Sequence, residues 1–268
     1  MPGPRPGSRV RLDQLVVDRG LARSRSEAQA LILAGDIRIP GDPGRRLAAG
    51  QRMDREQPLV RLAGPIWASR GGDKLAAAVR DFNLAIEGLV CLDAGASTGG
   101  FTDVLLAGAV ARVYAVDVGH GQLLPRLATD PRVVVLDRTN LRTLAALPEP
   151  IDLAALDLSF ISLRLVLGPV RGLLAPGGRV VALVKPQFEA GRTEVARGGI
   201  VRDPAVHRRV LLDLADHARD AGLVAVNLMP SPRRGRSANQ EFLALLEVAA
   251  DRQAEPGVWD TLVTAALA

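Results

Sequence analysis

From residue 89 onward, short apolar runs alternate with stretches of helical character. Five runs are rich in aliphatic and β-branched residues, and each ends in a polar residue or a glycine turn: LVCLDAG, RVYAVDVG, RVVVLDR, IDLAALDLS and GRVVALVKP. Segments between them, among them 100–109 and 203–221, have the apolar spacing of helices. Buried strands separated by helices predict an α/β fold built on a parallel, doubly wound sheet.

The residues that close these runs predict where the functional site lies. They are Asp93, Asp117, Asp137, Asp157 and Lys185. Parallel strands place their carboxyl ends at one edge of the sheet, and ligands of such folds bind beyond that edge. We therefore expect a site assembled from these strand ends.

The first 63 residues follow a different pattern. Apolar residues at helical spacing predict a short helix that ends near Gly20. Ser24 and Glu27 have the spacing of a capping box, which predicts a second helix that ends at Gly35. A short strand over 37–39 then leads into a turn rich in Pro and Gly. We expect three segments: a small α/β domain over 1–63, a linker over 64–73 and a larger domain over 74–268.

The excess positive charge of this 268-residue chain lies in the small domain. The formal net charge is +5; residues 1–63 hold 12 Arg against 7 acidic residues, and residues 64–268 hold 22 basic and 22 acidic residues. A basic arm beside a neutral body favours binding of a polyanion, although solvated surface charge is the alternative. The candidate phosphate ligands at the helix ends and outer faces are Arg9, Arg11, Arg19, Arg23 and Arg25. A second basic segment, SPRRGR, predicts a loop over the entrance for such a polyanion, or a merely solvated loop, with Arg233, Arg234 and Arg236.

Composition excludes several classes of protein. No apolar run approaches the roughly 18 residues of a membrane span, and the N-terminus has no apolar stretch of the signal-peptide kind. The single cysteine, Cys91, excludes an internal disulfide and a cysteine-built zinc site. We expect a cytoplasmic protein without a metal.

The glycine turn after the first strand of the larger domain indicates a nucleotide cofactor. The segment LDAGASTGGF lacks the G-x-G-x-x-G spacing of dinucleotide-binding enzymes. Its opening acid and wider glycine gap resemble the S-adenosylmethionine loop of class I methyltransferases. The candidate cofactor residues in the turn are Asp93, Gly95, Ser97, Thr98, Gly99, Gly100 and Phe101. Asp117 would accept the ribose hydroxyls and Asp137 would address the adenine, with a helix cap or turn acid as the alternative role for either.

The chain contains 34 basic residues, of which only Lys74 and Lys185 are lysine. Arginine stays charged, whereas a lysine can act as a base where burial and a second cation favour the neutral amine. The fourth strand ends in LDLSFIS, without the D/N-P-P-Y/F motif of nucleic-acid N-methyltransferases, which argues against a nitrogen acceptor. Methylation of a cytosine carbon needs a nucleophilic cysteine, and Cys91 lies inside a strand, where it would pack in the core. A hydroxyl acceptor remains, and it needs a base. The set Lys74, Asp157, Lys185 and Glu241 resembles the catalytic tetrad of ribose 2′-O-methyltransferases.

Two resemblances extend this interpretation. GLARSRSEAQALILAGDIRI resembles the RNA-binding module named after ribosomal small-subunit protein four. Together with WASRGGDKL, CLDAGASTGGFTDVLL, DVGHGQL, DLSFISL, LVKPQFE and GGIVRDP, it makes the chain similar to the TlyA family, whose catalytic domain is of the FtsJ type. The linker Pro65-Ile66-Trp67-Ala68 departs from that family's pattern.

The family resemblance implies a Rossmann-like class I methyltransferase that uses S-adenosyl-L-methionine to methylate ribose 2′-hydroxyls of ribosomal RNA, at cytidines, within ribosomal subunits. It implies Lys185 as general base and Asp157 as its orienting partner, with Lys74 and Glu241 positioning the hydroxyl. We expect a monomer. Phe160 would stack on a base or the cofactor, or else belong to the core.

Three alternatives remain open at this point. The first is a membrane-active hemolysin, a label that the family often carries. The second is a non-catalytic ribosome-assembly factor that binds RNA. The third is another RNA-modifying enzyme with the same N-terminal module, such as a pseudouridine synthase.

Overall fold

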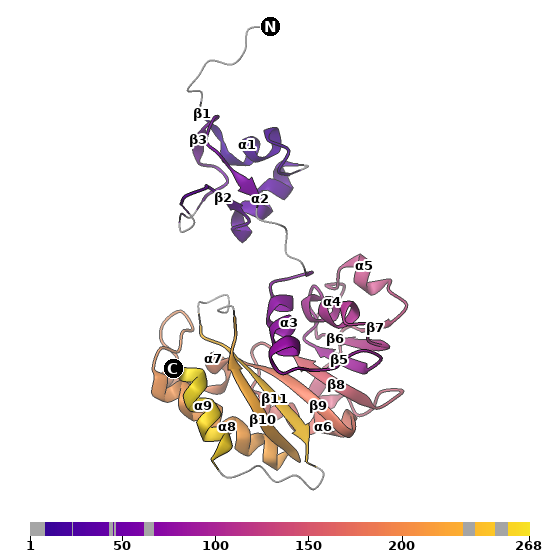
Figure 1. Cartoon of the computed structure of the whole chain (residues 1–268). Coiled ribbons are helices and arrows are strands. Elements are labelled where there is room, and N and C mark those ends of the chain that lie inside the picture. The colour runs from indigo at the N-terminus through magenta and orange to yellow at the C-terminus, as the bar shows by residue number, and fades with distance from the viewer. Residues whose placement is uncertain are drawn as a thin grey trace. The chain divides into compact units, whose positions relative to one another are not determined.

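The computed structural model describes residues 9–22, 24–42, 45, 47–61, 67–232, 239–249 and 257–268. The chain divides into two compact units, Met1–Ile66 and Trp67–Ala268 (Figure 1). The division lies inside the segment predicted as a linker. Residues 64–66 are outside the described residues, and Trp67 already packs on the hydrophobic cluster of the second unit. Its ring system lies against Gly72, where an added Cβ would be 2.4 Å from Trp67 Cβ.

The first unit is a small α/β domain. Its elements are β1 (Arg9–Arg11), α1 (Leu12–Asp18), α2 (Arg25–Ala34), β2 (Ile37–Arg38), β3 (Arg52–Asp54) and β4 (Val60–Arg61). β1 pairs with β3 and β2 with β4, both antiparallel. Ser24 caps α2 by accepting a hydrogen bond from the Glu27 amide (3.1 Å), and Gly35 ends it with a left-handed φ of 79°. Leu12, Leu15 and Val16 are buried between the elements.

The second unit is built on a seven-stranded sheet in the order β10-β11-β9-β8-β5-β6-β7. The strands are β5 (Val90–Ala94), β6 (Arg112–Val116), β7 (Val133–Leu136), β8 (Ile151–Leu156), β9 (Leu174–Val184), β10 (Leu223–Pro230) and β11 (Phe242–Val248). β5 to β9 run parallel. The predicted α/β class with a doubly wound sheet is confirmed.

Helices cover both faces of this sheet (Figure 1). They are α3 (Gly71–Asp81), α4 (Gly100–Ala107), α5 (Pro125–Ala128), α6 (Leu167–Leu173), α7 (Pro186–Glu189), α8 (Pro204–Asp220) and α9 (Val258–Leu267), with 3₁₀ turns at Leu141–Thr143, Leu163–Leu165 and Arg192–Glu194. Apolar residues of α3 and α4 pack on one face, and those of α6, α8 and α9 pack on the other. Neighbouring residues within a strand face opposite clusters, as Cys91 and Leu92 do, so the strands read as continuous apolar runs.

The sheet departs from the parallel prediction at one edge. β11 pairs antiparallel with β9, and β10 pairs antiparallel with β11. Hydrophobic periodicity does not encode strand direction, which is why this edge was predicted as parallel. The consequence is functional, because β11 starts, rather than ends, at the edge where the parallel strands finish.

Candidate active site

The carboxyl edge of the sheet surrounds a cavity of about 880 Å³. Its walls come from five places: the start of α3, the turn after β5, the segment after β8, the segment after β9, and the residue before β11. The lining includes Ser69, Lys74, Gly95, Ser97, Thr98, Gly100, Phe101, Asp157, Ser159, Phe160, Lys185, Gln187, Phe188, Gly199 and Glu241. The cavity is large enough for a cofactor and part of a substrate.

Two lysine–carboxylate pairs lie in this cavity. Lys185 Nζ is 2.6 Å from Asp157 Oδ1 and donates to Ser159 Oγ at 3.0 Å. Lys74 Nζ donates to Glu241 Oε2 at 2.5 Å. Each lysine is only 8% exposed. The structure therefore brings all four predicted tetrad residues into one cavity, each cation beside a carboxylate that offsets the cost of burying it.

The antiparallel edge explains how residues so distant in sequence meet. Phe242 pairs with Val184 across β11 and β9. One residue further along the same register, Glu241 and Lys185 come to neighbouring positions. A slip by one residue would turn Glu241 to the opposite face of the sheet. Lys74 reaches Glu241 from the first turn of α3.

The glycine turn after β5 fits a nucleotide cofactor. Gly95 has a φ of 85°, and a Cβ there would be 2.5 Å from the backbone oxygen of Asp157. At Gly100, a Cβ would be 2.2 Å from Ser69 Oγ. The absence of side chains at these positions lets the turn pack closely on Asp157 and Ser69 while it lines the cavity at the start of α4. The predicted cofactor residues Gly95, Ser97, Thr98, Gly100 and Phe101 all line the cavity, and Gly99 lies within the same turn with a φ of 98°.

The three strand-end acids predicted to bind the cofactor hold the protein's own loops. The Asp117 carboxylate accepts from the amides of Ser97 (2.8 Å) and Gly119 (2.7 Å). Asp137 accepts from the Gly121 amide at 2.8 Å and hydrogen-bonds His120 at 2.9 Å. The Gly121 amide, more than His120, holds the pKa of Asp137 below its usual value.

Asp93 is fully buried, and it too lies outside the cavity lining. Its Oδ2 accepts from both the amide (2.8 Å) and the hydroxyl (2.6 Å) of Thr102, which joins the end of β5 to α4. Burial raises the pKa of Asp93 to about 7, despite the opposing effect of the Thr102 hydrogen bonds. Asp93 therefore ties the end of β5 to the start of α4, on either side of the glycine turn.

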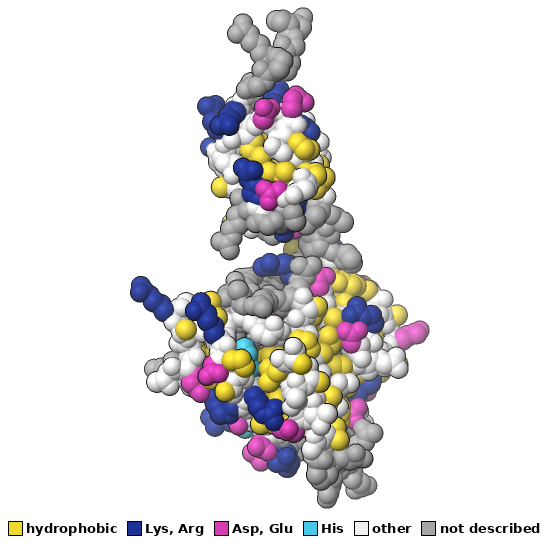
Figure 2. All heavy atoms as spheres, turned by 60° about the vertical axis from the view of Figure 1, so that its left-hand side comes forward, with side chains coloured by type: hydrophobic (Ala, Val, Ile, Leu, Met, Phe, Trp, Pro, Cys, Tyr) yellow, Lys and Arg dark blue, Asp and Glu magenta, His cyan; other side chains and the backbone are white. Residues whose placement is uncertain are grey.

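The predicted RNA-binding arginines fall into three groups. Arg9 is exposed on β1. Arg11 and Arg25 both bind Asp13, and Arg19 donates to the backbone oxygen of Arg55 at 2.7 Å. Arg23, Arg233, Arg234 and Arg236 lie outside the described residues. Figure 2 shows basic side chains beside acidic ones on the visible face of the first unit.

Sequence reasoning missed two residues that shape the cavity walls. Glu189 accepts from the Ser162 hydroxyl (2.6 Å) and the Leu163 amide (2.9 Å), and so fixes the segment after β8. Asn239, fully buried, accepts from the Val201 amide at 2.9 Å and donates to the Gly199 oxygen at 2.7 Å. Glu189 lies within the quoted motif LVKPQFE, but nothing in a motif reveals which backbone groups a side chain will contact.

Phe160 does not have one of the two roles predicted for it, that of a core residue. It is 90% exposed, has a φ of 63°, and lies with its ring 5.1 Å from that of Phe188. The alternative that Phe160 belongs to the core is wrong. A non-glycine residue held at positive φ with its ring in solvent indicates a constraint other than packing.

Comparison with known proteins places this geometry in a class. The sequence model of the FtsJ-like methyltransferase family matches residues 67–248, and that of the S4 domain matches residues 10–43. The chain is 46% identical over 246 residues to the 16S/23S rRNA (cytidine-2′-O)-methyltransferase TlyA of Mycobacterium tuberculosis, covering 91% of this chain and 92% of the relative. It is 36% identical to Hemolysin A of Brachyspira hyodysenteriae, covering 88% and 98%. The solved structure of a candidate hemolysin from Streptococcus thermophilus superposes with a TM-score of 0.73 at 38% identity, covering 98% of this chain and 96% of that one.

The fold and the cavity are thus those of an FtsJ-like methyltransferase joined to an S4 domain, and the cofactor of this class is S-adenosyl-L-methionine. The chain belongs to the TlyA family. Over the part of the chain that the structure describes, no helix is both long and apolar enough to cross a membrane. The same residues contain no group of three or more side chains suited to hold a metal ion.

Proposed function

We propose that this protein transfers a methyl group from S-adenosyl-L-methionine to the 2′-hydroxyl of a cytidine ribose in ribosomal RNA, with Lys185 as the general base. The observation that carries the proposal is the presence of two lysine–carboxylate pairs in the cavity that the glycine turn lines. Ribosomal RNA, cytidine and the 2′-hydroxyl come from the printed activity of the relative with 46% identity. Ribosomal subunits as substrate place the protein in the cytoplasm. All four tetrad residues come from one chain, which supports a monomer.

A ribose hydroxyl is a weak nucleophile until its proton is removed. Lys185, after releasing its own proton to solvent, accepts that proton on the lone pair of its neutral amine. Asp157 Oδ1, 2.6 Å from Nζ, and Ser159 Oγ, at 3.0 Å, fix the amine in place. After transfer the ammonium has a carboxylate beside it, so the charge that forms is stabilised where it forms.

Lys74 and Glu241 orient the substrate. Lys74 keeps its position through Glu241, and a cation held at the cavity wall can donate a hydrogen bond to the hydroxyl oxygen as its proton leaves. Because Glu241 is 3% exposed, this pair is shielded from solvent screening.

S-adenosyl-L-methionine, when bound, supplies a methyl group activated by its sulfonium. The residues that would hold it are those of the turn from Gly95 to Phe101, with Asp117 fixing the turn through the Ser97 amide. The exposed ring of Phe160, paired with Phe188, offers a stacking surface for a nucleobase at the same cavity.

Replacing Lys185 by arginine tests the role of the base. Lys185→Arg keeps the positive charge beside Asp157 but has no accessible neutral form, so methyl transfer to ribosomal subunits should fall by at least 100-fold. Binding of cofactor and of subunits should be unchanged. Transfer of labelled methyl groups and filter binding measure the two properties separately.

Lys74→Arg is the matched control, because Lys74 acts as a cation and not as a base. It should retain measurable turnover above that of Lys185→Arg. If Lys185→Arg keeps turnover within tenfold of the wild type, Lys185 is not the base.

A further inference from the structure

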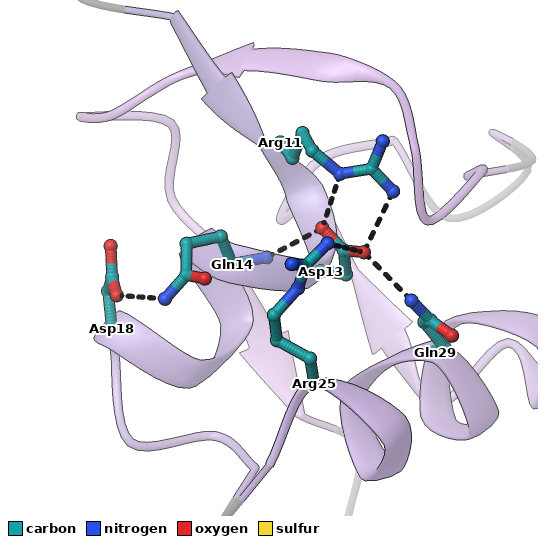
Figure 3. Close-up of polar contacts among 6 residues, drawn as sticks. All are labelled: Arg11, Asp13, Gln14, Asp18, Arg25 and Gln29. Atoms are coloured by element: carbon teal, nitrogen blue, oxygen red, sulfur yellow. Dashed lines mark hydrogen bonds and ion pairs between the residues drawn. The ribbon is translucent and has the colours of Figure 1, made fainter.

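One carboxylate organises the basic surface of the S4 domain. Asp13, at the start of α1, has a side chain with no solvent exposure. Arg11 binds it in bidentate fashion, with Nε 3.1 Å from Oδ1 and Nη2 2.9 Å from Oδ2. Arg25 Nη2 donates to Oδ2 at 3.0 Å. Figure 3 shows the two guanidinium groups converging on this carboxylate from different elements, β1 and α2.

The protein completes the shell around Asp13 with neutral donors. Gln29 Nε2 donates to Oδ2 at 3.0 Å, and the amide of Gln14 donates to Oδ1 at 2.9 Å. The hydrogen bonds from Arg11 hold the pKa of Asp13 far below its usual value, against the effect of burial. Asp13 is therefore charged at any pH at which the protein would encounter RNA.

The two arginines remain accessible although both are bound. Their side chains are 49% and 51% exposed, while that of Asp13 is buried beneath them. A guanidinium has five N–H donors, and Arg11 directs two of them at Asp13. The cluster of Arg11, Arg25 and Asp13 has two positive charges and one negative charge, and the positive charges lie on the outside.

We propose that Asp13 is the positioning residue of a two-arginine phosphate clamp: its buried carboxylate holds Arg11 and Arg25 side by side, so that both contact backbone phosphates of ribosomal RNA together. The proposal rests on the proposed function, which supplies RNA as the ligand. Immobilising a long side chain on binding costs conformational entropy. Because Asp13 already holds both arginine side chains in the free protein, this cost is met on folding and not on RNA binding.

This arrangement gives an expectation opposite to that of simple charge counting. Removing a negative charge from a surface that binds a polyanion should strengthen binding. If Asp13 positions the clamp, Asp13→Asn should weaken binding, because the neutral amide cannot hold both guanidinium groups.

The test uses the full chain and ribosomal subunits purified from cells that lack this protein, with affinity measured by filter binding at several salt concentrations. Asp13→Asn should bind at least tenfold more weakly, and the slope of log affinity against log salt should fall by about 1 to 2, as expected for lost phosphate contacts. Asp18→Asn is the matched control. Asp18 lies on the same helix and also contacts an arginine and a glutamine, but it is 36% exposed. Its substitution should leave affinity unchanged or raise it.

A second variant separates positioning from folding. Arg11→Lys keeps the charge on an exposed side chain but loses the bidentate contact with Asp13, so it should weaken binding nearly as much as Arg11→Gln does. Arg52→Lys, exposed on the neighbouring strand β3, should have little effect. In the Asp13→Asn background, Arg11→Gln and Arg25→Gln should each cost less affinity than in the wild type.

Unchanged or tighter binding by Asp13→Asn, with an unchanged salt slope, would overturn the clamp while leaving the proposed function intact. A wild-type protein that does not bind subunits would overturn both. If Asp13→Asn does not fold, the comparison of Arg11→Lys with Arg52→Lys decides the question.

Discussion

Two interior carboxylates of this protein, those of Asp93 and Asp13, have pKa values far from the usual one, in opposite directions. Asp93 is buried beside Thr102, and burial raises its pKa to about 7, from 3.8 when unperturbed. Asp13 shows the opposite effect, since two guanidinium groups stabilise its charge. Burial alone therefore does not determine the direction of a pKa shift; the partners do.

The raised pKa of Asp93 has a measurable effect on stability. Between pH 4 and pH 7 the folded state binds more protons at Asp93 than the unfolded state does, so this residue makes the free energy of unfolding fall as pH rises. From pH 5 to pH 8 the loss should be about 2 kcal/mol. Asp93→Asn lacks this pH-dependent loss. Its free energy of unfolding should therefore rise relative to that of the wild type by about that amount between pH 5 and pH 8. Urea unfolding at both pH values, followed by the fluorescence of Trp67 and Trp259 in the second unit, measures the difference. A difference that does not change with pH would show that Asp93 is ionised when buried.

For single residues, the sequence indicated which residue types belong to the site better than it indicated which groups their side chains contact. The two lysines stood out because 32 other basic residues are arginine, and the glycines stood out because a turn against a ligand needs them. Asp93, Asp117 and Asp137 accept hydrogen bonds from Thr102, Ser97 and Gly121, and their roles toward the cofactor stay predictions. The direction of a side chain depends on the nearest unpaired amide, which a pattern of strand ends does not contain.

Two segments that carry cavity residues are held by single side chains. Asn239 bridges the backbone at Gly199 and Val201, and Glu189 bridges Ser162 and Leu163. Each segment also has backbone hydrogen bonds of its own, from the Gly199 amide to the Ala196 oxygen and from the Leu165 amide to the Ser162 oxygen. The two side chains add to these bonds in fixing the cavity walls.

Removing the Asn239 side chain should loosen one wall. Asn239→Ala leaves the Val201 amide and the Gly199 oxygen without this partner, at a cost of about 1–3 kcal/mol. We expect faster hydrogen exchange over residues 196–201 and about tenfold slower methyl transfer, with cofactor affinity within twofold of the wild type. Asn227→Ala, on β10, is the control and should change neither. If turnover stays normal while exchange accelerates, the wall does not position the substrate.

The element pattern was predictable where it repeats and not where it reverses. The helices expected over 100–109 and 203–221 are α4 and α8, because amphipathic spacing and caps such as Asp203 are local signals. The antiparallel entry of β11 is set by long-range pairing with β9. It is nevertheless the feature that places Glu241 in the site.

At the scale of the whole chain, charge and chemistry reside in different units. The surplus of five positive charges lies within residues 1–63, and the cavity is lined only by residues of the second unit. The two lysine–carboxylate pairs sum to zero charge. The tetrad itself therefore contributes no net attraction for a polyanion.

Deleting residues 1–63 should separate the two properties. The second unit has its own hydrophobic clusters on both faces of its sheet, so the truncated protein should fold and bind S-adenosyl-L-methionine as the full chain does. Its activity on ribosomal subunits should fall by at least 100-fold because the arginines of the first unit are gone. Calorimetry with the cofactor and methyl transfer to subunits measure the two. Undiminished activity would show that the S4 domain does not deliver the substrate.

The contact between Gly95 and Asp157 has a consequence for how this enzyme can change. Position 95 has room for a hydrogen atom and nothing larger, since a methyl group there would press on the backbone of the residue that holds Lys185. The glycine turn that would receive the methyl donor and the Asp157 backbone that supports the proton acceptor therefore cannot shift independently of each other. Gly95→Ala would displace Asp157 and with it the Lys185 amine, even in a molecule that still binds its methyl donor. Turnover would therefore be lost before cofactor binding.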